Sequence, residues 1–259
     1  MNAREVGDGR VAVVSPHLDD AVLSAWLVLT STRPVSVISC FAGVPEPSVQ
    51  GLWDKKTGRS SAAAAVAARR AEDVAALGLS ESEAVHLDLL DEQYRGEREP
   101  PRAELVALLR EHLAGAREVW LPAGLGGHTD HLAARDAALV ATTPTQRVRV
   151  YADLPYAGQP AWPVDVTHAP RDLAVHCLLS VLRRPVPAEE WRSALDGGGV
   201  RMRRAQRHVV RLTPPQKRAK VAALRRYSSQ LAALRCGPRH PLRERRLFAY
   251  EVHWTIDGI

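Results

Sequence analysis

Residues 11–30 read VAVVSPHLDDAVLSAWLVLT, and this stretch decides the fold class. The run at 11–14 is short, apolar and mostly β-branched, which predicts a buried strand. From Asp19 to about Thr30 the apolar residues return at helical spacing, which predicts a helix. The polar residues between these two runs lie where the strand ends and the helix begins. The stretch therefore predicts a strand, a polar turn and a helix in immediate succession.

The same alternation continues through the first two-thirds of the chain. Further strands are predicted at 35–41, 85–90, 118–122 and 148–151, and helices at 60–77, 102–114 and 132–140. Repetition of this kind builds a mostly parallel sheet with helices on both faces. We therefore expect an α/β protein with a Rossmann-like core, whose ligands lie at the carboxyl ends of the strands.

The pattern weakens in the C-terminal third. Strands are expected at 173–179, 208–212 and 249–255, and helices at 187–195 and 214–234. No clear linker and no internal repeat separates this part from the rest. We therefore predict one domain over 1–259, in which a core at 1–157 carries the functional site. An α+β extension at 158–259 is expected to pack on the same sheet.

A strongly basic stretch lies at 201–246. It holds fifteen Lys and Arg and one acid, Glu244, so its net charge is +14, whereas the whole 259-residue chain carries +6. The stretch has few aromatic residues and no recognisable nucleic-acid motif, so we expect no nucleic-acid partner. We favour a solvated face that also pairs with the acidic remainder of the chain. The alternative is that a few arginines hold a carboxylate or phosphate of the substrate at a pocket rim.

Composition excludes several other classes of protein. Apolar residues make up 46% and charged residues 25%, which are ordinary globular values. No apolar run approaches the roughly 18 residues that a membrane span needs, so no membrane partner is expected. The three cysteines, Cys40, Cys177 and Cys236, lie far apart and form no C-x-x-C pair. We therefore expect a cytoplasmic protein without a disulfide framework or a cysteine-bound zinc.

Two polar clusters each follow a predicted strand and open a helix. The first is SPHLDD at 15–20 and the second is GHTDH at 127–131. Each cluster alone could simply cap its helix. Together they supply three histidines and three aspartates, which suffice for a His₂–carboxylate metal site with spare acid–base groups. The residues alone leave open a metal-dependent hydrolase, a two-metal phosphoesterase and a catalytically silent binding protein.

These clusters resemble a known family. PHLDDAVLS at 16–24, together with GHTDH at 127–131, is similar to the PIG-L (LmbE-like) zinc-dependent N-acetylglucosaminyl de-N-acetylases. The segments RRAED at 69–73, YADLPYA at 151–157 and YSSQ at 227–230 also resemble parts of that family. The resemblance is good over residues 10–157 and loose beyond.

The resemblance implies one Zn²⁺ ion per subunit, or another divalent ion, held by His17, Asp20 and His131. It implies that Asp19 is the general base that takes a proton from water. His128 would be the general acid or would stabilise the oxyanion, and Asp130 would orient it. The implied reaction is hydrolysis of the N-acetyl amide of an amino sugar in specialised-metabolite (antibiotic) biosynthesis. It leaves the exact acetylated glycoside and the oligomeric state open.

Three further residues are candidates for substrate contact. Arg69 is one by resemblance, although an isolated helical arginine is more often a surface residue. Asp91 follows a predicted strand and is expected either to hold a sugar hydroxyl or to be an ordinary loop acid. Trp53 lies in a long loop at 43–58 and is expected either to stack on a sugar face or to pack locally.

The chain departs from the commoner family pattern at three points. Leu18 and Ala21 stand where proline and glutamate are commoner, and neither position is an implied ligand. No tyrosine stands in 123–127, where some members have one just before the second motif. Backbone N–H groups of the glycines there are an alternative source of oxyanion stabilisation.

Overall fold

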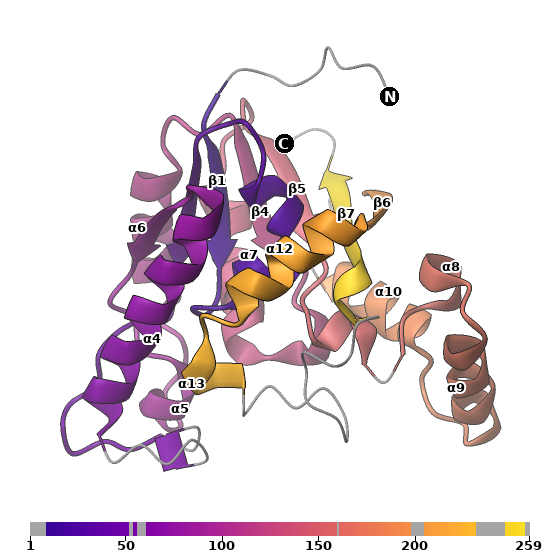
Figure 1. Ribbon diagram of the computed structural model, residues 1–259. Coiled ribbons are helices and arrows are strands. Elements are labelled where there is room, and N and C mark those ends of the chain that lie inside the picture. Colours follow the sequence, from indigo (N-terminus) through magenta and orange to yellow (C-terminus); the bar gives the residue numbers. More distant parts are fainter. Residues whose placement is uncertain are drawn as a thin grey trace.

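The computed structural model describes residues 9–51, 54–55, 61–159, 161–197, 205–231 and 247–256, and these build one sheet between layers of helices (Figure 1). The strands are β1 (Val11–Ser15), β2 (Val35–Ser39), β3 (Glu83–His86), β4 (Glu118–Pro122), β5 (Arg147–Tyr151), β6 (Gln206–Arg211) and β7 (Tyr250–Ile256). Their order across the sheet is β3-β2-β1-β4-β5-β7-β6. The expected α/β class is confirmed.

Helices connect these strands, and several of them cover the sheet. The helices are α1 (Asp20–Ser24), α2 (Trp26–Leu29), α4 (Ala62–Leu77), α5 (Glu92–Arg95), α6 (Arg102–Leu113), α7 (Thr129–Ala141), α8 (Val164–Thr167), α9 (Pro170–Val181), α10 (Pro187–Gly197), α12 (Pro214–Leu224) and α13 (Ser228–Leu231). Short 3₁₀ turns occur at Gly78–Ser80, Leu125–Gly127, Tyr156–Gly158 and Leu247–Ala249. Helix α6 packs against α7, whereas α12 packs against α1 and α4. Helices α8 and α9 lie to one side of the sheet (Figure 1). None of the helices in these described ranges is long and apolar enough to cross a membrane.

Strand β1 is the point at which the strand order reverses. It pairs in parallel with β2 on one side and with β4 on the other. All five of its residues are buried, which its continuous run of apolar side chains requires between two helix layers. The carboxyl ends of β1 and β4 therefore lie side by side, with the polar turns at 15–20 and 123–128 next to each other. In open α/β sheets a ligand binds at such a reversal.

The C-terminal third adds two strands to the same sheet. Strand β7 runs antiparallel to β5, and β6 pairs with β7 at the edge. A buried ion pair joins two of these added elements, because Lys220 Nζ on α12 donates to Glu251 Oε1 on β7 over 2.7 Å. The carboxylate of Glu251 also accepts the backbone N–H groups of Trp26 (2.9 Å) and Leu27 (3.0 Å) at the start of α2.

Several expected elements differ from the observed ones. The strand expected at 173–179 is wrong, because these residues lie in α9, where Pro170 occupies the first turn and Leu173 and Leu178 remain exposed. The helix expected at 19–30 is divided at Ala25 into α1 and α2. Likewise, the described part of the helix expected at 214–234 is divided into α12 and α13.

Candidate metal and active site

The two polar clusters meet at the ends of β1 and β4. The imidazole ring centre of His17 lies 5.0 Å from that of His128 and 5.2 Å from that of His131. The rings of His128 and His131 are 5.3 Å apart. Residues separated by more than a hundred positions thus form one cluster, as the pairing of β1 with β4 requires.

Three of these side chains are arranged to hold a cation. One ligand atom from each of His17, Asp20 and His131 lies within 4.8 Å of the others. Asp20 Oδ2 is 3.2 Å from Nδ1 of His17 and 3.3 Å from Nε2 of His131. Two imidazoles and one carboxylate are a donor set that suits zinc, which commonly keeps a further position for water.

The second nitrogen of each of these histidines is held by a buried carboxylate. His17 Nε2 lies 3.1 Å from Asp130 Oδ2, and His131 Nδ1 lies 2.7 Å from Asp153 Oδ1. Such partners fix the orientation of a metal-binding imidazole and increase its basicity. Asp153 was missed as a functional residue in the sequence. Its position could have identified it, because Asp153 comes two residues after β5 and so lies at the same edge of the sheet as the two polar clusters.

The charge of the cluster also fits a divalent cation. Asp19, Asp20, Asp130 and Asp153 are all buried here. Burial alone would raise the pKa of Asp20, but His131 and His17 lower it to about 2, so this carboxylate is ionised at neutral pH. A positive ion between the ligand atoms would offset this concentration of negative charge.

Asp19 occupies the N-cap position of α1, but its side chain makes no capping hydrogen bond. The alternative that the Asp19 side chain simply caps the helix is therefore wrong. Burial, and after it the neighbouring carboxylate of Asp20, raises the pKa of Asp19 to about 7. A carboxylate with a pKa near neutrality suits a group that first accepts a proton and then returns it.

Asp130 does not orient His128 in the expected way. Its carboxylate contacts His17 and Arg95 and accepts the backbone N–H of Glu92 over 2.9 Å. Only its own backbone N–H reaches His128, where it donates to Nδ1 over 3.2 Å. The acid beside the other nitrogen of His128 is Glu92, whose Oε2 lies 3.3 Å from Nε2. Burial and the two neighbouring histidines lower the pKa of His128.

A tyrosine does reach this cluster, from a different loop. The ring of Tyr156 lies edge-on against His131 with a centroid distance of 5.6 Å. Gly126 allows this approach, because a Cβ at that residue would lie 2.4 Å from the tyrosine ring, and its φ of +81° favours glycine. Burial, followed by the carboxylate of Asp20, raises the pKa of Tyr156, so its hydroxyl stays protonated.

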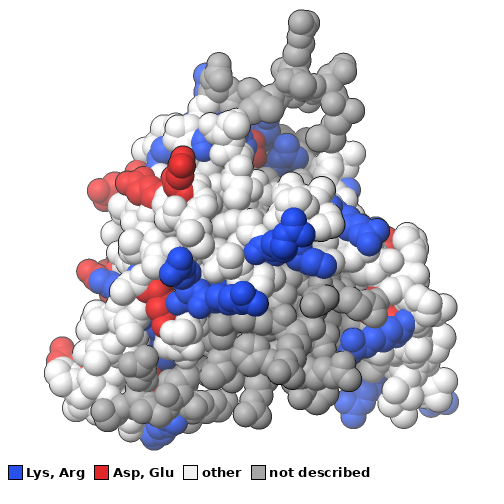
Figure 2. Space-filling model, in the orientation of Figure 1, with Lys and Arg blue, Asp and Glu red and all other residues white. Residues whose placement is uncertain are grey.

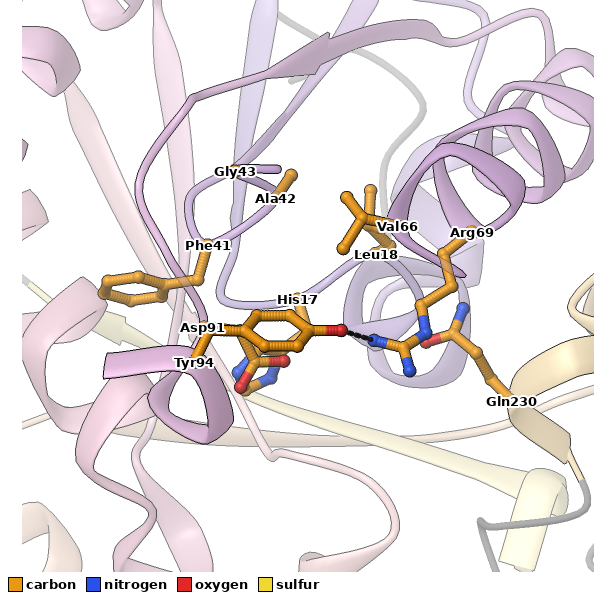
Figure 3. Close-up of a pocket in the computed structure, with 10 residues that line it drawn as sticks. All are labelled: His17, Leu18, Phe41, Ala42, Gly43, Val66, Arg69, Asp91, Tyr94 and Gln230. Atoms are coloured by element: carbon orange, nitrogen blue, oxygen red, sulfur yellow. Dashed lines mark hydrogen bonds between the residues drawn. The ribbon is translucent and has the colours of Figure 1, made fainter. Parts of the chain in front are cut away.

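A polar pocket of about 270 Å³, counting its opening to solvent, adjoins His17 (Figure 3). Its lining residues are His17, Leu18, Phe41, Ala42, Gly43, Val66, Arg69, Asp91, Tyr94 and Gln230. The two polar candidates from the sequence, Arg69 and Asp91, therefore both lie in its wall. Trp53 lies outside the described residues.

Arg69 is buried in this wall, which removes the alternative of a surface arginine. Its Nη2 donates to Asp54 Oδ1 over 2.8 Å, and its Nη1 donates to the hydroxyl of Tyr94 over 3.2 Å. Asp91 caps the start of α5, where its side chain accepts the backbone N–H of Gln93 over 3.0 Å. Asp54 and Tyr94 gave no signal in the sequence, because their role depends on contacts between distant segments.

The described part of the basic stretch covers one face of the molecule. Figure 2 shows Lys and Arg side chains gathered over α12 and its neighbours. The exposed residues there include Arg211, Arg218, Arg225 and Arg226. Residues 201–204 and 232–246, which include further arginines of this stretch, lie outside the described residues.

Comparison with known proteins identifies a family. The family model described as "PIG-L: GlcNAc-PI de-N-acetylase" matches residues 12–142, just over half of the chain. This range contains both polar clusters. No curated protein sequence gives a significant match.

Several solved structures resemble the whole chain. A triple mutant of a deacetylase of the teicoplanin biosynthetic pathway is 27% identical, with a TM-score of 0.72, and 96% of this chain covers 98% of that one. The zinc-inhibited form of teicoplanin deacetylase is 26% identical, with a TM-score of 0.71 and the same coverage. The A40926 pseudoaglycone deacetylase is 25% identical, with a TM-score of 0.68, and the match covers 97% of this chain and 98% of that one.

Proposed function

Because the chain belongs to the PIG-L family, we propose that its site hydrolyses the N-acetyl amide of an amino sugar and releases acetate and a free amine. The chain is a metal-dependent de-N-acetylase, and its metal is zinc. The observation that carries the proposal is the meeting of His17, Asp20 and His131 directly beside Asp19. When bound there, zinc supplies a Lewis acid that polarises an amide carbonyl and makes water acidic enough to lose a proton near neutral pH.

The metal ligands in this proposal are His17 Nδ1, Asp20 and His131 Nε2. Those two nitrogens lie nearest the carboxylate of Asp20, whereas the opposite nitrogens contact Asp130 and Asp153. Asp130 and Asp153 therefore position the ligands. Asp19 is the general base in this proposal, because its buried carboxylate follows the ligand His17 and caps no helix.

The leaving amine and the developing oxyanion need donors on the other side of the substrate. His128 lies within ring contact of both ligand histidines, so it serves as the acid or as the oxyanion donor. Tyr156 keeps its proton and adjoins His131, so it supplies a second donor from that side. Arg69 and Asp91 bind the sugar from the wall of the pocket beside His17.

The proposed substrate is an acetylated amino sugar carried by a larger glycoside of an antibiotic pathway. The support is the similarity over nearly the whole chain to deacetylases of teicoplanin and of the A40926 pseudoaglycone.

A two-metal phosphoesterase is not favoured. A second candidate group, His17 with His128 and Asp130, shares His17 with the first. The guanidinium of Arg95 already neutralises Asp130, with Nη2 at 2.5 Å from Oδ1. A second cation would therefore compete with a fixed positive charge.

We also propose that the chain works as one domain, because β6 and β7 complete the sheet that carries the site. The free thiols of Cys40 and Cys177 suit a reducing compartment such as the cytoplasm.

The experiment is a substrate panel with the zinc-loaded protein. Simple, inositol-linked and glycopeptide-linked N-acetylglucosaminides are incubated, and release of free amine and acetate is followed. Amine release that stops with a chelator and returns with about one zinc per chain supports the proposal. Phosphate release from aryl phosphates, with no amine release from any glycoside, would contradict it.

A further inference from the structure

One wall of the pocket beside His17 carries a side-chain N–H group that finds no acceptor in the described part of the chain. Gln230 belongs to α13 and lines this pocket. Its Nε2 is shielded from solvent and has no hydrogen-bond partner among the residues that the structure describes. A buried N–H group without an acceptor is costly, so such a group in a pocket wall indicates a ligand that supplies the acceptor.

Helix α13 is fastened to α4, which fixes the position of Gln230. The hydroxyl of Tyr227 donates to Asp73 over 2.6 Å. The backbone N–H and the hydroxyl of Ser229 donate to Glu72 over 2.9 Å and 2.7 Å. These contacts give a structural reason for the YSSQ and RRAED segments, because each supplies one side of the same junction.

The same helix α4 carries Arg69, so the junction places Gln230 beside it. Figure 3 shows the Gln230 side chain extending from α13 toward Arg69, with Tyr94 on the far side of the guanidinium. Arg69 is bonded to Asp54 and Tyr94 within the protein. The amide of Gln230 makes no such bond through Nε2 within the described ranges, so this N–H group lacks an acceptor there, whereas those of Arg69 have theirs.

We propose that Gln230 is a specificity residue that hydrogen-bonds a hydroxyl group of the sugar bound beside His17. A hydroxyl fits because it both donates and accepts, so it pairs with the amide whichever way its oxygen and nitrogen are turned. The identity of the ligand as an amino sugar rests on the proposed function. The observations that the Gln230 amide is unpaired at Nε2 among the described residues and lines this pocket are independent of the proposed function.

The test compares Gln230→Ala with the wild type on a methyl N-acetylglucosaminide and its 3-, 4- and 6-deoxy analogues. We expect KM for the parent glycoside to rise about tenfold, as loss of one such bond implies, with kcat changed much less. For one deoxy analogue the variant and the wild type should have the same KM, because the partner of Gln230 is already missing. An unchanged KM for the parent, or equal losses on all four glycosides, would overturn the proposal.

Two further variants separate the hydrogen bond from shape and stability. Gln230→Met keeps the approximate size of the side chain but has no amide to donate or accept a hydrogen bond, and we expect it to share the selective loss. Gln206→Ala removes an exposed glutamine on β6 and should leave every KM unchanged. Thermal unfolding of each variant shows whether α13 remains docked.

Binding to the metal-free protein separates this proposal from the proposed function. If the metal-free wild type binds these glycosides in calorimetry but the zinc-loaded protein releases no amine, the proposed reaction fails, while selectively weaker binding by Gln230→Ala still supports the hydroxyl contact. If turnover is normal and binding by Gln230→Ala is unchanged, only the role of Gln230 fails. If no glycoside binds the wild type, both are overturned.

Discussion

Asp153 Oδ1 lies 2.7 Å from His131 Nδ1, with both side chains buried. The other oxygen of Asp153 accepts the backbone N–H of Leu125 over 3.0 Å. One carboxylate therefore fixes both a candidate zinc ligand and the glycine-rich turn that precedes the second motif. Strand β5, which leads into Asp153, and strand β4, which leads into that turn, are neighbours in the sheet.

We expect Asp153→Ala to weaken zinc binding by about 10- to 100-fold, as loss of a carboxylate behind a metal-binding histidine commonly does. The imidazole of His131 would lose its fixed orientation while its ligand nitrogen remained. Competition with a chromophoric chelator measures the affinity. Asp165→Ala, which removes an exposed carboxylate on α8, is the control. Equal zinc affinities in Asp153→Ala and the control would show that Asp153 only supports the fold.

We expect Asp19→Asn to retain zinc but to lower kcat by roughly 10²–10⁴-fold, the usual contribution of a general base. The amide keeps the shape of the carboxylate but cannot accept the proton from water. Metal analysis and steady-state kinetics on the same preparation check both parts. Near-normal turnover would remove Asp19 from the mechanism, and loss of zinc would instead make it a ligand.

Local signals in the sequence were sufficient to predict the polar turns that follow β1 and β4. The apolar run at 11–14 identifies a buried strand, and the reversal of strand order at β1 brings His17 and His131 together. The strand expected at 173–179 failed because a short apolar run fits either a strand or a helix. Pro170, at the first turn of α9, was the available signal for a helix.

The supporting contacts could not be predicted, because they depend on how distant segments pack. The sequence suggests that Asp130 serves His128, its neighbour in the motif, yet its carboxylate contacts His17 and Arg95. The amide of Gln230 reaches the pocket only because α13 is fastened to α4. Neither relationship has a spacing that a sequence pattern could reveal.

We expect the two halves of the buried pair Lys220–Glu251 to differ in their effect on stability. Glu251→Ala leaves the ammonium of Lys220 buried without its partner and also frees the N–H groups at the start of α2. Its free energy of unfolding should fall by about 3–5 kcal/mol. Lys220→Met should cost less, because Glu251 keeps those two N–H donors. Urea unfolding of both variants gives the comparison, and equal losses would contradict this asymmetry.

We expect His253 to make the protein less stable in mild acid. Its ring stacks on His208 at 4.9 Å and lies 4.8 Å from Trp120. Burial, followed by the nearby His208 and Arg149, lowers the pKa of His253 from 6.5 to about 4. The folded protein therefore binds this proton less readily than the unfolded chain does. The contribution of His253 to the free energy of unfolding is therefore complete above pH 6.5 and is lost as the pH falls toward 4.

The expected loss through His253 is up to about 3 kcal/mol, since each pKa unit corresponds to about 1.4 kcal/mol. The test is the free energy of unfolding in urea at several pH values between 7 and 4, for the wild type and for His253→Phe. Phenylalanine keeps an aromatic ring against Trp120 but has no proton to bind. The wild type should therefore lose stability more steeply than the variant across this range. Parallel profiles would show that the acid sensitivity comes from other groups.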